Sequence, residues 1–567
     1  MIPKLKQNTI RHLLEHSVSH YAKLPSIAFA GDMAISYQAL FRKINELTAE
    51  LFRHNIHAGS KVVILGENSP NWVVSYLAVT SMGAVAVPVL PGFSDANIRH
   101  IVRDSDSEAV IVADKLRSAI EDFQTPALSK IISLEDFTIT TVKESLSEHV
   151  SKLRQHIQER FGSEPSAEAI FQALPYPKPE DLAAIIYTSG TTGNSKGVVL
   201  THSNIVTDVL YSLERFPLTT DDRFLSILPL SHTYEATGGM LCPLATGVSI
   251  YYLRGLPTPQ RLLSSMESVK PTGVLTVPLV VDKIYRRKIL PGLQKSKLTW
   301  GAYQKPFFRK QLNKIAGKKM IQSLGGCLRF FMFGGAALNK DVEQFLIDAK
   351  ISYSTGYGMT ETSPILTINP FGRVRMGSCG QPIPGIEIKI HNPNPETGIG
   401  EICVRGPIVM QGYYKNKKAT DAIFLEGGWL CTGDLGFFDE DGYLFIRGRS
   451  KNVIVGPNGE NIYPEIIEQQ LIQSPYIDEC VVYQHQQRLV AKVHLDQDNI
   501  DQHLASLGEP VEDRDEAIAA LLEQEREKTN IHLPTFSHIK MMEVFPEAFE
   551  KTPTNKVKRY LYIPSEE

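Results

Sequence analysis

The chain has 567 residues, of which 43% are hydrophobic and 21% are charged. This length and composition supply enough apolar material for several folded domains and exclude a largely disordered chain. With 59 lysines and arginines against 62 aspartates and glutamates, the formal net charge is −3, which argues against a dedicated nucleic-acid-binding protein.

The cysteines and the apolar runs of the sequence indicate the cellular compartment in which the protein is expected. The six cysteines are scattered and form no C-x-x-C pair, so neither a zinc ribbon nor a disulfide scaffold is supported and a reducing cytoplasm is expected. The first residues lack the apolar stretch of a signal peptide, and the longest apolar candidate, residues 76–90, is interrupted by Ser81, Gly83 and Pro88. We expect a soluble, cytoplasmic protein, or one peripheral to the inner face of a membrane.

The first part of the chain alternates between helical and strand patterns. Helices are predicted over residues 37–54 and 70–82, and residues 139–181 are interpreted as a helix plus a polar, proline-rich connector. Strands that alternate with helices predict a largely parallel sheet covered on both faces. The strand-like runs in this part are residues 61–68, 84–89 and 109–114.

The alternation continues from residue 182 to about 390, with a strand-like run at 223–230 among others. Near residue 400 the pattern changes to short strands separated by glycine and aspartate turns, which favours antiparallel pairing. The remainder mixes helical and strand patterns, including an acidic helix over 513–529. We predict an N-terminal body over residues 1–448 and a small C-terminal α+β domain over residues 449–567.

The most informative motif is YTSGTTGNSKG at residues 187–197, which follows a buried strand pattern. Glycines let the backbone approach a ligand closely, hydroxyls and amides can donate to phosphate oxygens, and Lys196 adds a positive charge. The motif is not a Walker A loop, because a serine precedes the lysine and a glycine follows it. Taken alone, it could also be a flexible surface loop.

Together with the motifs that follow it in order, this loop resembles the phosphate-binding loop of the AMP-forming acyl- and aryl-CoA synthetases, the adenylate-forming or ANL superfamily. The resemblance extends from about residue 25 to the C-terminus, and the order of the motifs makes coincidence implausible. The matching segments are residues 187–197, 228–232, 333–338 and 357–362, Gly433-Asp434, Gly448-Arg449 and residues 551–556.

The resemblance implies an α/β fold with a large N-terminal body of mixed, mostly parallel sheets, a small β-rich subdomain and a small mobile C-terminal α+β domain. It also implies a reaction in two steps. A carboxylate attacks the α-phosphate of ATP to give an acyl-adenylate and pyrophosphate, and a thiol then displaces AMP. The first step brings an anion to a polyanion, so we expect catalysis to rest on charge neutralisation and positioning.

The resemblance assigns the triphosphate to the glycine-rich loop and to a magnesium ion. Glu361 would carry Mg²⁺, which prefers oxygen ligands beside phosphates, and Thr360 would contact the α-phosphate. By itself, Glu361 could be an ordinary acid at a helix N-terminus. The loop residues predicted to bind the nucleotide are Thr188, Ser189, Gly190, Thr191, Thr192, Gly193 and Lys196.

The adenine is assigned to two segments near the middle of the chain. On the resemblance, Tyr357 stacks on the purine while the backbone of Gly335 lines its slot, with Ala336 and Gly358 beside them.

The remaining assignments fall in the C-terminal part. Asp434 would accept hydrogen bonds from the ribose and Arg449 would reach the same sugar, although Asp434 could also be a simple turn residue. Lys451 matches the family's hinge position, about which the small domain is expected to swing between the two steps. Lys556 would bridge the substrate carboxylate and the ATP oxygens, or else belong to a solvated basic tail. Gly459 resembles the glycine beside which the pantetheine of CoA passes.

Residues 228–239 and 277–285 resemble the branch of the family that activates long-chain fatty acids. An apolar channel distinguishes adjacent chain lengths by only about 1–3 kcal/mol per methylene, so a range of fatty acids is expected. His232 either gates the acyl entrance or is a packed structural histidine. The acceptor is CoA or the phosphopantetheine thiol of an acyl carrier protein. The further alternatives are a ligase for aryl or other acids and a catalytically silent lipid-handling protein.

Residues 286–319 form a basic segment in which lysine and arginine alternate with leucine and aromatic residues, and no aspartate or glutamate occurs between Asp282 and Asp341. Such a segment can lie on an anionic lipid surface, which would suit an enzyme that takes fatty acids from a bilayer. The alternative is a solvated helical insertion packed on the body.

Overall fold

The structure is a computed structural model that describes residues 2–142, 165–188, 195–255, 257–456, 460–506, 513–552 and 556–564. The chain divides into two units. The first unit comprises Met1–Val281, Gly292–Glu387 and Val404–Leu430, and the second comprises Asp282–Pro291, Ile388–Cys403 and Cys431–Glu567. The boundary predicted between residues 448 and 449 concerns a movable domain and stays a prediction.

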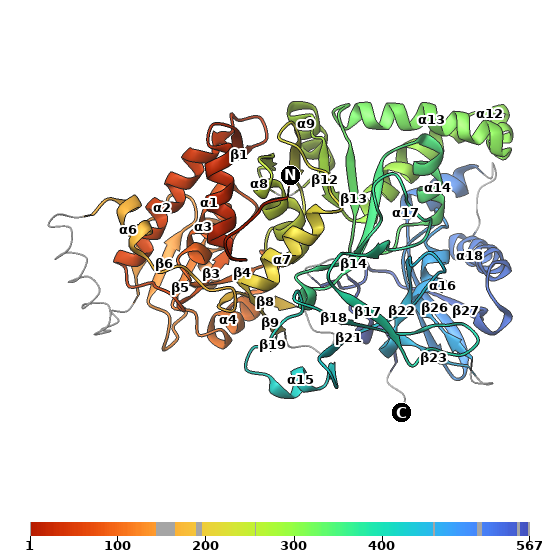
Figure 1. Cartoon of the computed structure of the whole chain (residues 1–567). Coiled ribbons are helices and arrows are strands. Elements are labelled where there is room, and N and C mark those ends of the chain that lie inside the picture. Colours follow the sequence, from red (N-terminus) through yellow and green to blue (C-terminus); the bar gives the residue numbers. More distant parts are fainter. Residues whose placement is uncertain are drawn as a thin grey trace. The chain divides into compact units, whose positions relative to one another are not determined.

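The first unit contains an eight-stranded sheet in the order β19-β9-β8-β4-β3-β5-β6-β7 (Figure 1). Strands β8, β4, β3, β5 and β6 are parallel, and β7, β9 and β19 run antiparallel to their neighbours. The strands are β3 (Lys61–Leu65), β4 (Val85–Val89), β5 (Ala109–Val112), β6 (Lys130–Ser133), β7 (Ile139–Thr141), β8 (Leu182–Thr188), β9 (Lys196–Thr201) and β19 (Gly412–Tyr413).

A nine-stranded sheet in the order β16-β15-β14-β13-β12-β10-β11-β1-β2 completes the first unit. From β14 to β1 along this order, neighbouring strands are parallel. The strands are β1 (Pro25–Phe29), β2 (Ile35–Ser36), β10 (Arg223–Ser226), β11 (Ser249–Tyr252), β12 (Gly273–Thr276), β13 (Phe330–Phe333), β14 (Tyr353–Gly358), β15 (Ile365–Ile368) and β16 (Gln381–Pro382).

Both sheets form because their strands are nearly continuous apolar runs. Val63, Val87, Val110 and Ile185, for example, are buried on adjacent strands of the eight-stranded sheet. Strands that are buried on both faces lack the alternation of polar and apolar residues seen in half-exposed strands. The predicted strands at 61–68, 84–89 and 109–114 and the largely parallel sheet are therefore confirmed.

Helices cover the sheets, and most begin at a serine or threonine that caps the first turn. Ser36 accepts a hydrogen bond from the backbone of Ala39, and Thr201 and Asn204 cap each other's backbone at the next helix start. The predicted helices at 37–54 and 70–82 are confirmed, whereas residues 143–164 of the predicted connector lie outside the described residues. The α-helices described up to residue 421 are α1 (Ile10–Tyr21), α2 (Tyr37–Arg53), α3 (Pro70–Ser81), α4 (Asp95–Asp104), α6 (Ala167–Ala173), α7 (His202–Leu213), α8 (Cys242–Ala245), α9 (Pro259–Val269), α10 (Pro278–Ile284), α11 (Leu290–Gln294), α12 (Lys297–Tyr303), α13 (Pro306–Ser323), α14 (Lys340–Ala349) and α15 (Lys417–Asp421).

The described part of the second unit contains three groups of strands, of which the smallest is the antiparallel pair β23 (Ile454–Val455) and β24 (Asn461–Ile462). In the first group, β18 (Gly400–Arg405) lies between β17 (Glu387–His391) and β21 (Trp429–Phe438) in the sheet. Strand β22 (Leu444–Arg449) pairs antiparallel with β21. In the second, β25 (Ile477–His485) is antiparallel to β26 (Arg488–Leu495), which is parallel to β27 (Met541–Val544). This sheet packs with α16 (Pro464–Leu471), α17 (Gln497–Ser506) and α18 (Arg514–Ile531) around a buried apolar core. The predicted C-terminal α+β structure is confirmed.

The length and composition of the helices bear on membrane insertion. Across the described part of the chain, no helix combines the length and the apolar character needed to cross a bilayer.

Candidate functional site

The predicted phosphate loop joins two paired strands of the first unit. Strands β8 and β9 are antiparallel, and Thr188 lies opposite Lys196 in the last register pair before the loop. The residues Ser189, Gly190, Thr191, Thr192 and Gly193 lie outside the described residues. Strand β8 is buried along most of its length, so the loop leaves a buried strand as predicted.

Tyr413 brings two of the predicted site residues together. The Nζ atom of Lys196 lies 5.0 Å from the centroid of the Tyr413 ring, within the range of a cation–π interaction. The Tyr413 hydroxyl donates a hydrogen bond to Glu361 Oε1 over 2.7 Å. A cation predicted to meet phosphate and a carboxylate predicted to carry magnesium therefore lie on either side of one aromatic side chain.

The backbone around Tyr413 explains this placement. Strand β19 pairs with β9, with Tyr413 opposite Val198, and the Met410 N–H donates to the Glu361 carbonyl over 2.9 Å. Burial, together with the charge of Glu361, raises the pKa of Tyr413 above its ordinary value, so the phenol stays a neutral donor. Tyr413 was not predicted as a site residue, because tyrosine in a G-Y-Y run carries no chemical signal of its own.

Glu361 fits a magnesium ion that is shared with a nucleotide. Its side chain is buried, with 7% of the residue exposed, and it follows β14 in the short turn η4 (Thr360–Thr362). Within the described residues, no three histidine, cysteine, aspartate or glutamate side chains gather around a common point. Mg²⁺ usually binds one or two carboxylates together with phosphates and water, and a single carboxylate beside a phosphate loop meets that pattern.

The predicted adenine residues lie at the carboxyl ends of two adjacent parallel strands. Phe333, the last residue of β13, is in register with Thr355, and Gly335 and Tyr357 each lie two residues farther along the chain. Gly335 is exposed and has a φ of +81°, a conformation that favours glycine, and Ala336 beside it is also exposed. Ligands of open α/β sheets bind at this edge, so the geometry suits the predicted purine slot.

Gly358 is required for a different reason. A Cβ atom at this position would lie 1.8 Å from the carbonyl oxygen of Pro364, because β14 and the segment that follows it approach closely. Only glycine fits there without moving the backbone. Thr360 and Glu361 follow shortly after Gly358 in the chain.

The predicted acyl segment, residues 228–232, is held by Asn68. The Asn68 Nδ2 donates to Ser226 Oγ over 3.0 Å and to the Leu228 carbonyl over 2.6 Å, and its Oδ1 accepts from the Leu230 N–H over 2.8 Å. Strand β10 ends at Ser226 for this reason, several residues earlier than the run 223–230 predicted. Asn68 was also missed, since a single asparagine after a strand is typical of any turn.

His232 is the last residue of this segment and is half-buried. Its Nδ1 accepts a hydrogen bond from the Tyr234 N–H over 3.2 Å, which makes Nε2 the protonated nitrogen of a neutral ring. Glu235 follows at the start of the π-helix η2 (Glu235–Leu241) and is fully buried. Burial raises the pKa of Glu235 to about 8, so near pH 7 it is mainly neutral and would not repel an acyl carboxylate.

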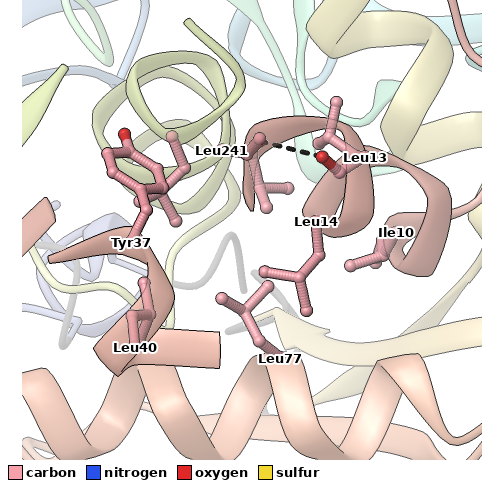
Figure 2. Close-up of a pocket in the computed structure, with 9 residues that line it drawn as sticks. Ile10, Leu13, Leu14, Tyr37, Leu40, Leu77 and Leu241 are labelled. Atoms are coloured by element: carbon pink, nitrogen blue, oxygen red, sulfur yellow. Dashed lines mark hydrogen bonds between the residues drawn. The ribbon is translucent and has the colours of Figure 1, made fainter. Parts of the chain in front are cut away.

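A small apolar pocket lies among α1, α2, α3 and the η2–α8 segment (Figure 2). Its two hydroxyl groups are already used, since Tyr37 donates to the Val248 carbonyl and Ser17 to the Leu13 carbonyl, each over 2.8 Å. The other lining residues are apolar, so the pocket has no group to hold a carboxylate or a phosphate. We interpret it as a packing gap in the core.

In the second unit, the predicted ribose residues form a pair. Asp434 on β21 is opposite Arg449 on β22, and Arg449 Nε lies 3.2 Å from Asp434 Oδ1. The Thr432 hydroxyl accepts from the Asp434 N–H over 3.1 Å within β21. Its neighbours thus orient Asp434, and 13% of its side chain is exposed. A carboxylate that accepts hydrogen bonds from a sugar requires a fixed orientation of this kind.

The other predicted residues of the second unit are more exposed. Lys451 lies in the short turn η5 (Ser450–Asn452) and is exposed. Lys556 is also exposed, and its backbone pairs with Thr552 through two hydrogen bonds of 2.8 and 3.2 Å. Gly459 lies outside the described residues.

Comparison with known proteins identifies the family. Residues 14–414 match the family of AMP-binding enzymes. Long chain acyl-CoA synthetase 6, a peroxisomal protein of Arabidopsis thaliana, is 30% identical over 497 residues, which span 82% of this chain and 68% of the relative. The long-chain-fatty-acid–CoA ligase FadD15 of Mycobacterium tuberculosis is 29% identical over 548 residues, 89% of this chain and 86% of the relative. The long-chain-fatty-acid–CoA ligase 6 of Homo sapiens is 32% identical over 486 residues, which span 79% of this chain and 67% of the relative.

Solved structures share the fold. The anthranilate CoA ligase AuaEII in complex with anthranoyl-AMP has a TM-score of 0.76 at 21% identity and covers 99% of this chain and 97% of its own. The O-succinylbenzoate coenzyme A synthetase MenE of Bacillus subtilis, in complex with ATP and magnesium ion, has a TM-score of 0.72 at 22% identity. The match covers 97% of this chain and 98% of the MenE chain. These similarities confirm the predicted α/β fold.

Replacing Tyr413 tests the bridge between Lys196 and Glu361. Tyr413→Phe keeps the ring but removes the hydrogen bond to Glu361, and hydrogen bonds to charged groups contribute about 1.5–3 kcal/mol, so we expect the Kd for ATP with magnesium to rise about 10-fold or more. Tyr414→Phe is the matched control, because the Tyr414 hydroxyl contacts the exposed Asp106 over 3.3 Å. Titration calorimetry checks both variants, and equal Kd values would contradict the role of Tyr413.

Proposed function

The chain belongs to the family of AMP-binding enzymes, and on that premise we propose that it activates long-chain fatty acids with ATP and transfers the acyl group to CoA. The substrate class is supported by similarity to long-chain acyl-CoA synthetases and ligases over 82% and 89% of this chain. The ATP-dependent step is supported by the arrangement of Lys196, Tyr413 and Glu361.

In the first half-reaction a fatty acid oxygen attacks the α-phosphorus of ATP and pyrophosphate leaves. Lys196 and the glycine-rich loop, including Thr188, hold the β- and γ-phosphates and neutralise part of their charge. Glu361 holds Mg²⁺, which, when bound, neutralises phosphate charge. Thr360 contacts the α-phosphate, and Tyr357, Gly335, Ala336 and Gly358 line the adenine slot.

In the second half-reaction the thiol of CoA attacks the acyl carbon of the adenylate. A carbon–sulfur bond forms, the bond to the AMP oxygen breaks, and the thiol proton is released to solvent. Asp434 and Arg449 retain the ribose while this occurs. Gly459 allows the pantetheine arm to pass, and Lys451 acts as the hinge between the two steps.

The substrate class is tested by ATP–pyrophosphate exchange with fatty, aryl and short-chain acids. We expect exchange with several long-chain fatty acids and little with the others, since each methylene buried in an apolar channel contributes about 0.8 kcal/mol. The products are then measured with CoA and with a holo acyl carrier protein as acceptors. Exchange that occurs only with aryl or short acids contradicts the proposed substrate, and transfer only to the carrier protein contradicts the proposed acceptor.

Lys556 is the residue we propose to assist adenylation from the second unit. It is exposed, and its backbone is held by Thr552, whose N–H donates to the Lys556 carbonyl over 2.8 Å. A positive charge placed between the attacking carboxylate and the α-phosphate reduces the repulsion between these two anions.

Lys556→Ala should separate the two half-reactions. We expect pyrophosphate exchange to fall by about 10²–10³-fold, the scale of losing one transition-state partner, whereas thioester formation from supplied acyl-adenylate changes little. Rapid-quench measurements of each half-reaction check this. Equal losses in both would argue against the proposed division of labour.

We also propose that α12 and α13 contact anionic membranes (Figure 1). Leu298 is 88% exposed, Phe307 70%, Ile315 58% and Phe308 49%, although each is a large apolar residue. Exposed lysines surround these apolar residues. Arg309 also lies on this face, and it forms an ion pair with Asp348 over 3.1 Å. Apolar side chains among lysines match a lipid surface, where each cation contributes about 1 kcal/mol.

Flotation with vesicles that contain anionic lipid tests this surface at low and physiological salt. We expect the protein to float, and the triple variant Leu298→Ser, Phe307→Ser, Phe308→Ser to lose nearly all flotation, since each serine removes about 1.5–3 kcal/mol of apolar burial. Met33→Ser is the matched control, because Met33 is 94% exposed but lies elsewhere. No flotation of the unmodified protein at either salt concentration would end the membrane proposal.

A further inference from the structure

Lys556 belongs to a short hairpin at the end of the second unit. The Thr552 N–H donates to the Lys556 carbonyl over 2.8 Å, the Lys558 N–H donates to the Glu550 carbonyl over 2.9 Å, and Lys551 and Val557 form a β-bridge. A two-stranded hairpin is only marginally stable in water by itself. Its position in the second unit therefore depends on contacts with other elements.

Arg559 supplies the main contact just after the hairpin. Its Nη1 forms an ion pair with Glu468 Oε1 on α16, and its Nη2 donates to the Val482 carbonyl on β25 over 2.8 Å. The same Glu468 oxygen accepts from the Val482 N–H over 2.7 Å. One carboxylate thus joins α16, β25 and the chain that carries Lys556.

The pair is largely removed from solvent. The Arg559 side chain is 18% exposed and the Glu468 side chain 13%, so the pair is screened much less than a surface pair. Removing one partner of such a pair leaves a desolvated charge without its counter-ion, which is a large cost.

The first strand of the hairpin has an anchor of its own. Lys551 forms an ion pair with Glu479 Oε1 on β25, and Glu479 Oε2 accepts from the Phe549 N–H over 3.1 Å. By contrast, Lys558 pairs with Glu550 inside the hairpin, and the Glu550 side chain is 58% exposed. A pair that joins two residues of the hairpin itself, with the Glu550 side chain largely exposed, contributes little to where the hairpin lies in the unit.

We propose that Glu468 and Arg559 are a positioning pair that sets the place from which Lys556 acts in adenylation. This inference rests on the proposed function. Neither residue needs to touch the substrate: the pair fixes the base of the hairpin on α16 and β25, and the hairpin carries the lysine. A displacement of about 1 Å at a reacting group can cost about 100-fold in rate, so a loosened base has a specific kinetic effect.

Glu468→Gln tests the pair, because glutamine can still accept from Val482 but no longer carries the charge that binds Arg559. We expect adenylation to fall about 10–100-fold while thioester formation from supplied acyl-adenylate stays within about twofold of the unmodified enzyme. Glu550→Gln is the matched control and should leave both half-reactions unchanged. If Glu468→Gln does not fold, Arg559→Lys is measured instead, since it keeps the charge but loses the bond to Val482.

The outcomes are distinguished by including Lys556→Ala in the same assays. Selective loss of adenylation in Lys556→Ala and in the variant of the pair supports the inference. Selective loss in Lys556→Ala alone overturns the inference and leaves the proposed role of Lys556 intact. Equal loss of both half-reactions in the variant of the pair shows a structural effect and overturns the inference. No selective loss in Lys556→Ala overturns the proposed role of Lys556, and the inference with it.

Discussion

The candidate site depends on the contact that Tyr413 makes with both Lys196 and Glu361. A lysine and a glutamate that are both proposed to meet a polyanionic nucleotide would, if left in direct contact, neutralise each other in a salt bridge. The tyrosine contacts both charged groups, since its ring faces the ammonium group and its hydroxyl faces the carboxylate. The two charges are thereby held near each other without a direct contact. Each charged group is held in place while it keeps the capacity to bind phosphate or metal.

Polar side chains hold the functional segments in the same way elsewhere in the chain. Asn68 captures the backbone of the acyl segment, Asp208 accepts from the Ile365 N–H over 3.0 Å just after the Glu361 turn, and Glu468 holds the base of the Lys556 hairpin. The contacts of Asn68 and Asp208 satisfy backbone groups that have no strand or helix partner, and that of Glu468 is an ion pair with Arg559. Segments that carry function outside regular structure are thereby ordered by side chains that take no part in the chemistry.

The predicted site residues are distributed over both units. The first unit has the triphosphate, metal and adenine residues, and the second has Asp434, Arg449, Lys451 and Lys556. Such a distribution suits a reaction with two unlike steps. The first step needs added positive charge at the phosphates, and the second needs access for a thiol to the same acyl carbon.

The sequence by itself determined the strands, because β3, β4 and β5 are buried on both faces and so read as apolar runs, and it determined the order of the chemical motifs. It also indicated Gly358 as a nucleotide residue, whereas the collision of a side chain with the Pro364 carbonyl at this position is visible only in the structure. Only the tertiary structure decided that Tyr413, Asn68 and Arg559 belong with these motifs, and that the strand at 223–230 stops at Ser226. Their partners are distant in the chain, and neither periodicity nor residue type encodes which distant backbone groups a polar side chain meets.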